Sequence, residues 1–215
     1  MKKFTTFSFA LLLLGATATT LHAQEIKPAL TAAFQTLQSA STMGDRMTAN
    51  NKLNLIAAKF PDNWAANYYA AFSNAFVSLS EPDAKRKDQL LDAAEAWLVK
   101  TTQLNAANDE TLVLTAYLAY ARFLVDPRNR WKKYLDLMNT NLDRAKKANP
   151  NNPRIYYLQG VPLFARPVTY GGGKAVAKPY FEKATALFAA QDTTDITKPS
   201  WGAKENAAYL AQCNQ

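Results

Sequence analysis

Histidine and cysteine are nearly absent from this 215-residue sequence. The only histidine is His22, in a segment that we expect to be removed, and the only cysteine is Cys213. Without histidine, imidazole proton relays, Ser-His-Asp triads and His-ligated zinc sites are excluded. A single thiol likewise excludes an intramolecular disulfide and a multi-thiolate metal site. The sequence therefore predicts neither a metal ion nor a cofactor.

Long apolar runs are also missing, apart from a short one near the N-terminus. Met1-Lys2-Lys3 is basic, residues 9–14 are apolar, and Leu21-His22-Ala23 fits a small-residue cleavage site. This order predicts a signal peptide over residues 1–23 and a mature domain over residues 24–215. A membrane anchor is the alternative, although the run is short for a bilayer. No cysteine near the cut could carry a lipid, so we expect a periplasmic or secreted protein without a transmembrane segment.

Proline and asparagine mark helix joins at a regular spacing. Pro150-Asn151-Asn152-Pro153 aligns with residues 61–64 and 106–109, at intervals of 45 and 44 residues. Pro150 denies the preceding helix a backbone donor, and Pro153 stands in a first turn that needs none. Ten residues after each join stands a small residue that allows close helix packing. These residues are Ala71, Ala116 and Gly160.

The second helix of each predicted hairpin carries a pattern of its own. A small, a large and a small residue recur at i, i+4 and i+7, with departures at Thr101 and Met138, and this spacing places them on one helical face. The sets are Ala49/Leu53/Ile56, Ala94/Leu98/Thr101, Met138/Leu142/Ala145 and Ala177/Phe181/Ala184.

With residues 156–160, the last of these sets resembles the tetratricopeptide family, and the resemblance extends over about residues 25–189. It implies an all-α fold, with about four antiparallel helical hairpins in a solenoid and a capping helix at the C-terminus. The period near 45 residues exceeds the ~34 of that family, so HEAT-like hairpins are the structural alternative. Pro179 falls inside the eighth predicted helix, which either begins near Lys178 or is kinked. The expected helices cover residues 27–39, 45–59, 63–79, 83–104, 109–125, 128–147, 153–165, 174–190 and 200–213.

Aromatic residues recur in the first helix of each hairpin. In tetratricopeptide arrays these helices line the inner surface, where rigid amphipathic rings suit an extended peptide or a partner helix. The alternative is that rings at helical spacing form the core. The residues assigned to partner binding are Tyr68, Phe72, Tyr117, Tyr120, Tyr157, Phe164 and Arg154.

Charge is divided unevenly along the chain. Residues 122–183 hold 13 basic and 4 acidic residues, a local charge of +9, whereas the rest of the mature chain carries −3. This division predicts a partner that is anionic, such as an acidic protein or peptide. A solvated helix face is the alternative, because Arg128, Arg130 and Lys132 spread around their helix. Nucleic acid is not expected as a partner of an exported protein.

Three of the seven glycines lie in one segment, Pro167-Val168-Thr169-Tyr170-Gly171-Gly172-Gly173-Lys174. It resembles a loop of exported tetratricopeptide-like proteins of the Bacteroidota. Because it precedes a helix, the hypothesis is an anion site formed by the backbone of Gly171, Gly172 and Gly173 with Arg166 and Lys174. It is not a P-loop, since Val168 and Ala175 break that pattern. The alternative is a turn that needs positive φ angles.

No catalytic group stands out. Asp88 and Asp92 lie one helical turn apart, but nothing accompanies them as a third catalytic group, and a solvated face explains them. We therefore predict an exported, non-enzymatic scaffold that binds a protein or peptide in the cell envelope. The alternative is a receptor or enzyme for a small anion or phosphorylated ligand at the Gly171–Lys174 loop. A third is a structural accessory of an envelope complex without a discrete site.

Overall fold

The fold is all-α, as predicted. The computed structural model describes residues 26–105 and 108–215, and within these ranges the chain forms helices and turns but no strand. The predicted signal peptide lies outside the described residues. A first helix covers residues 26–39. It is followed by α2 (Met43–Lys59), α3 (Trp64–Ser78), α4 (Ala84–Leu104), α5 (Asp109–Val125), α6 (Pro127–Ala148), α7 (Pro153–Ala165), the 3₁₀ turn η1 (Val168–Tyr170), α8 (Lys174–Ala189) and α9 (Ala203–Cys213).

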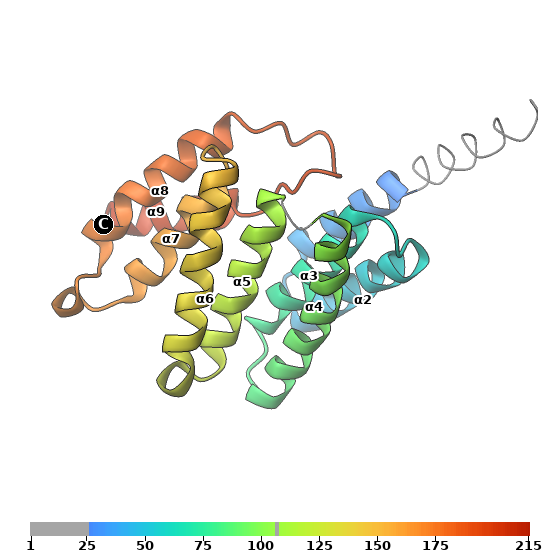
Figure 1. Ribbon diagram of the computed structural model, residues 1–215, viewed down its shortest axis with the longest axis horizontal. Coiled ribbons are helices and arrows are strands. Elements are labelled where there is room, and N and C mark those ends of the chain that lie inside the picture. Colours follow the sequence, from blue (N-terminus) through green and yellow to red (C-terminus); the bar gives the residue numbers. More distant parts are fainter. Residues whose placement is uncertain (1–25, 106–107) are drawn as a thin grey trace, which may run out of the picture.

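Successive helices pack as antiparallel pairs that stack into an array (Figure 1). The pairs α3/α4, α5/α6 and α7/α8 are the predicted hairpins, and α9 packs on α8 as the predicted cap. None of the described helices combines the length and apolar character needed to cross a bilayer.

Local chemistry sets the helix starts. The side chains of Asn63, Asp83 and Asn152 each accept a hydrogen bond from a backbone N–H in the first turn of the helix that follows. The last helix differs from its prediction, because it begins at Ala203 rather than at Ser200. Gly202, with a φ of 102°, turns the chain there. The eighth helix begins at Lys174 as predicted and includes Pro179, so the alternative of a start near Lys178 is wrong.

Small residues occupy the helix seams, as the repeat predicts. Ala71 and Ala116 are fully buried. At Gly160, a Cβ atom would lie 2.7 Å from the ring of Phe181, so only glycine lets α7 approach α8 this closely. Most of the face predicted for the second helices is buried as well, including Thr101 and Met138, which depart from the small-residue pattern. Ile56 and Leu98 are half-buried.

One segment does not belong to any hairpin. Residues 190–202, which we call the C-terminal strap, leave α8, reach toward the helix of residues 26–39 and return to α9 (Figure 1). The ammonium of Lys27 lies 3.1 Å from the carboxylate of Asp195, and the hydroxyl of Tyr69 donates to the carbonyl of Lys198 at 3.4 Å. The strap thus ties the last hairpin to the first helices of the array.

Candidate functional site

The strap ends by inserting Trp201 into the array. Its side chain is 5% exposed. The centre of its ring lies 4.8 Å from that of Phe72, 5.0 Å from that of Tyr117 and 6.4 Å from that of Tyr157. A residue of the last fifth of the chain therefore completes an aromatic cluster formed by α3, α5 and α7.

Hydrogen bonds hold Trp201 at both of its ends. The indole N–H donates to the hydroxyl of Tyr68 at 2.8 Å, and this hydroxyl donates to the Glu110 carboxylate at 3.2 Å. Glu110 pairs with the guanidinium of Arg154, whose Nη1 donates to the carbonyl of Trp201 at 3.1 Å. Burial, with the Glu110 carboxylate as second cause, raises the pKa of Tyr68 well above its usual value. Tyr68 therefore stays a protonated donor, and the ring of bonds is closed.

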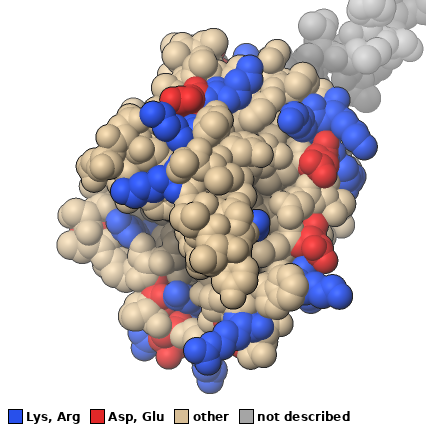
Figure 2. Space-filling view, turned by 90° about the vertical axis from the view of Figure 1, so that its left-hand side faces the viewer, with Lys and Arg blue, Asp and Glu red and all other residues tan. Residues whose placement is uncertain are grey.

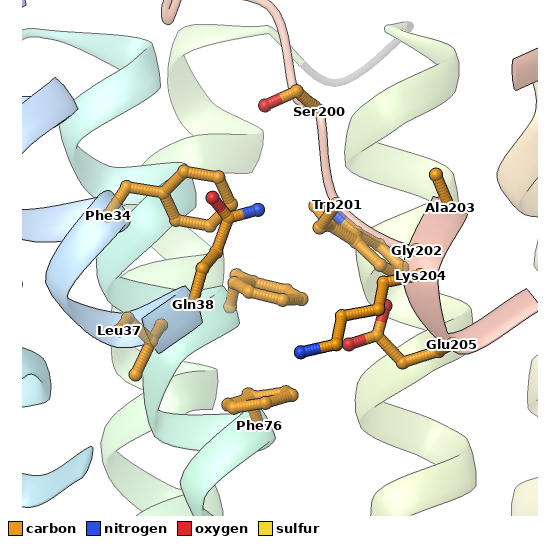
Figure 3. A pocket seen from close by; sticks show the side chains of 11 residues that line it. Phe34, Leu37, Gln38, Phe76, Ser200, Trp201, Gly202, Ala203, Lys204 and Glu205 are labelled. Carbon is orange, nitrogen blue, oxygen red and sulfur yellow. The ribbon is translucent and has the colours of Figure 1, made fainter. Parts of the chain in front are cut away.

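Beside Trp201 lies a pocket of about 310 Å³ between the helix of residues 26–39, α3 and the start of α9 (Figure 3). Its apolar walls come from Phe34, Leu37, Phe72, Phe76 and Trp201. The rings of Phe72 and Phe76 stack, with centres 5.7 Å apart and planes 25° from parallel. The walls therefore present flat apolar surfaces, which suit a planar ligand.

Polar side chains also line the pocket. Gln38 comes from the first helix, and Lys204 and Glu205 come from the first turn of α9. In Figure 3 the Lys204 ammonium points toward the space above Phe76. The pocket therefore combines apolar walls with one positive and one negative side chain, and the Lys204 ammonium can attract a carboxylate.

None of the described residues that line this pocket is a histidine, cysteine, methionine or tyrosine. Within residues 26–105 and 108–215, no group of three or more His, Cys, Asp or Glu side chains could hold a metal ion.

The aromatic residues predicted to face a partner are mostly inaccessible. Four tyrosines are buried, Phe164 is half-buried against Tyr209, and only Phe72 lines the pocket. The expected exposure is wrong because the strap and α9 cover the inner face on which these residues lie. The four buried tyrosines are Tyr68, Tyr117, Tyr120 and Tyr157.

Arg154 is also not a surface residue. Its side chain is 1% exposed and pairs with Glu110, so its predicted contact with a partner is wrong. The buried Arg122 has a similar role, since it pairs with Asp88, Asp92 and Glu95. The uneven charge along the sequence thus partly reflects pairing between the two halves, because these acids precede the basic segment.

A second arginine, Arg130 on α6, joins this cluster. Arg130 lies 2.7 Å from the Asp88 carboxylate. Hydrogen bonding from Arg130, and then from Arg122, lowers the pKa of Asp88 to about 2. Asp88 and Asp92 are therefore parts of a structural ion cluster that joins α4, α5 and α6. They are not merely a solvated face.

The glycine loop does not offer the backbone donors that an anion site requires. The N–H groups of Gly171, Gly172 and Gly173 donate to the carbonyls of Val168, Pro167 and Leu163 at 3.0, 3.2 and 2.9 Å. The hypothesis that these glycines bind an anion is thus wrong in its geometry. The alternative fits, because Gly171 and Gly173 have φ angles of 74° and 99°. Arg166 and Lys174 are exposed beside the loop.

Of the residues that line the pocket, sequence reasoning assigned only Phe72 to a site, and it missed Phe34, Phe76, Trp201 and Lys204 among the others. Phe76 stands four residues after Phe72, so helical spacing could have placed both on one face. Trp201 and Lys204 carry no such signal, because the irregular strap brings them to α3.

Comparison with known proteins relates the chain to a solved structure. No protein-family model matches the chain, and no curated protein does. The chain is similar to a solved structure, the HusA haemophore from Porphyromonas gingivalis, with a TM-score of 0.74 and 31% sequence identity. The similarity covers 89% of this chain and 92% of HusA.

Proposed function

Because this chain belongs to the same family as the HusA haemophore, we propose that it is a haem carrier. The observation that carries the proposal is the pocket beside Trp201, whose walls are stacked aromatic rings. Haem is a flat apolar macrocycle with two carboxylates on one edge, and both features have counterparts in this pocket.

The aromatic walls account for the macrocycle. Phe76 and Trp201 offer faces against which a porphyrin can stack, and Phe34 closes one side. At about 310 Å³ the pocket is at the small end of ligand sites, so part of the macrocycle reaches solvent at the mouth. Lys204 is exposed on α9 and pairs with a haem carboxylate there.

The iron takes no ligand from the pocket, since the described lining residues have no imidazole, thiolate, thioether or phenolate. Affinity then comes from burial of the macrocycle and from charge. A carrier benefits from this arrangement because release does not require a metal–ligand bond to break.

Two further proposals follow from the role of a carrier. The chain is exported, in keeping with the predicted signal peptide, and it does not catalyse a reaction. A protein-binding scaffold function, predicted from the hairpin array, stays a second candidate for surfaces outside the pocket. Trp131 on α6, which is 56% exposed, favours such a surface. The relation to tetratricopeptide proteins stays a prediction.

A haem titration of the mature chain tests the proposal. We expect a shifted Soret band with saturable binding, and roughly tenfold weaker affinity for Phe76→Ala, because one stacking face is lost. The matched control is Trp131→Ala, an exposed aromatic outside the pocket, with unchanged affinity. Absence of saturable binding, or equal affinity of Phe76→Ala and the parent at matched circular dichroism, would overturn it.

A further inference from the structure

The glycine loop between α7 and α8 has no part in the haem pocket, yet it carries two exposed apolar side chains. Val168 is 79% exposed and Tyr170 is 76% exposed, which is more than any other large hydrophobic residue of the described chain. The loop projects from the end of the array that lies at the lower left in Figure 1. Adjacent exposed apolar side chains of this kind can mark a surface that binds a partner or a membrane.

The loop is held in one conformation. Besides the three glycine N–H groups, the N–H of Tyr170 donates to the carbonyl of Pro167 at 2.9 Å. A Cβ atom at Gly172 would lie 2.4 Å from the carbonyl oxygen of Arg166, so this position accepts only glycine. The two apolar side chains are therefore presented by a rigid support.

The internal hydrogen bonds also prepare the loop for an apolar environment. A backbone N–H that leaves water without a partner is costly, and this cost keeps most loops out of membranes. Here the N–H groups from Tyr170 to Gly173 already have carbonyl partners within the fold. The tip can thus leave water without losing hydrogen bonds at those groups.

Positive charge surrounds the tip. Arg166 and Lys174 flank it and are exposed, and Lys178 lies one turn further along α8. No acidic residue occurs from Arg166 to Phe181. The first acid beyond, Glu182, lies 3.9 Å from Lys178. Figure 2 looks onto this end of the molecule and shows an uncharged centre with Lys and Arg side chains around it, and with fewer Asp and Glu side chains among them.

We propose that this loop docks the protein on the surface of an anionic lipid bilayer. Val168 and Tyr170 enter the headgroup region, where tyrosine is favoured, while Arg166 and Lys174 contact lipid phosphates. A protein partner is less suited to this tip, since a stable protein interface needs about 800 Å² per partner, and the apolar part here is two side chains. A bilayer needs no complementary shape, and so small an anchor makes attachment weak and reversible.

Vesicle binding by the mature chain tests the proposal. The probes are phosphatidylcholine vesicles with and without phosphatidylglycerol. We expect sedimentation with the anionic vesicles only, weakened roughly tenfold by Val168→Ser/Tyr170→Ser and also reduced by Lys174→Glu and by salt. Leu55→Ser, at an exposed apolar residue of α2, and Trp131→Ser are controls that should bind like the parent.

A fluorescent label gives a second readout. In a Cys213→Ser background, an environment-sensitive dye at Val168→Cys should shift to the blue on anionic vesicles, whereas the dye at Leu55→Cys should not. The proposal would be overturned if the protein did not sediment with anionic vesicles, or if it bound neutral vesicles equally well. It would also be overturned if the control variants lost binding and the loop variants did not. The proposal would also be overturned if the dye at position 168 shifted on addition of a protein partner but not on addition of any vesicle. In a haem titration without lipid, the loop variants should bind haem like the parent. A failure of the membrane proposal can therefore be told apart from a failure of the haem proposal.

Discussion

The guanidinium of Arg154 donates to the backbone carbonyl of Trp201 at 3.1 Å, across 47 residues of sequence. The same guanidinium pairs with Glu110, which accepts a hydrogen bond from Tyr68, the acceptor of the Trp201 indole. A buried ion pair thus fixes one wall of the pocket, so stability and ligand binding are expected to be linked at this point.

Replacement of Arg154 tests that link. Arg154→Met should lower the free energy of unfolding by about 3–5 kcal/mol, because it leaves the Glu110 carboxylate without its buried partner. It should also weaken haem binding, since Trp201 loses one of its supports. Urea unfolding and a haem titration measure the two effects. Arg128→Met, at an exposed arginine, should change stability by less than about 0.5 kcal/mol, and an equally mild effect of Arg154→Met would contradict the link.

The seam between α7 and α8 predicts an effect of added volume. Gly160→Ala should cost about 1–3 kcal/mol, because its Cβ meets the ring of Phe181 at 2.7 Å. Phe181→Leu should reduce this cost in the double variant. Gly44→Ala is the control, since the nearest atom to its Cβ lies 3.8 Å away, and it should be neutral or stabilising. Melting curves of these four variants measure the effects. If the losses of stability from Gly160→Ala and Phe181→Leu were additive in the double variant, the proposed contact between the two residues would be contradicted.

The helix seam at Gly160 and the contact of Trp201 differ in how far the sequence predicts them. The seam at Gly160 follows from a local repeat, since the join at Pro150 and the set ending at Ala184 have regular spacing. The contact of Trp201 with Tyr68 spans 133 residues and starts from a strap without periodicity. No local pattern encodes such a contact. Local patterns therefore predict an accessible inner surface, whereas in the structure the C-terminal strap covers it.

Acid should weaken the cluster of α4, α5 and α6. Hydrogen bonding from Arg130 lowers the pKa of Asp88 from 3.8 to about 2. A depressed pKa in the folded state contributes stability above the unfolded value, and this contribution is lost as pH falls from about 3.8 to about 2. Stability of the parent should therefore fall more steeply over this range than that of Asp88→Asn. Parallel curves from urea unfolding at several pH values would contradict the prediction.

Iron should matter little to affinity. Because the described pocket residues include no histidine, cysteine, methionine or tyrosine to hold the iron, metal-free protoporphyrin should bind within about threefold of haem. Lys204→Glu should weaken both, and more so at low salt, since it places a negative charge beside the carboxylates. Fluorescence quenching titrations measure these affinities. A strong preference for haem would show that a side chain ligates the iron and would contradict the pocket assignment.

The central claim is that a porphyrin binds in the pocket lined by Phe76 and Trp201, and NMR with diamagnetic zinc protoporphyrin tests it most directly. The ring current of the macrocycle shifts nearby resonances strongly, so the largest changes should fall on Phe34, Gln38, Phe76 and residues 201–205, which line the pocket. Resonances of Leu55 and Trp131 should stay in place. Largest shifts outside the pocket, with residues 201–205 unmoved, would contradict the account.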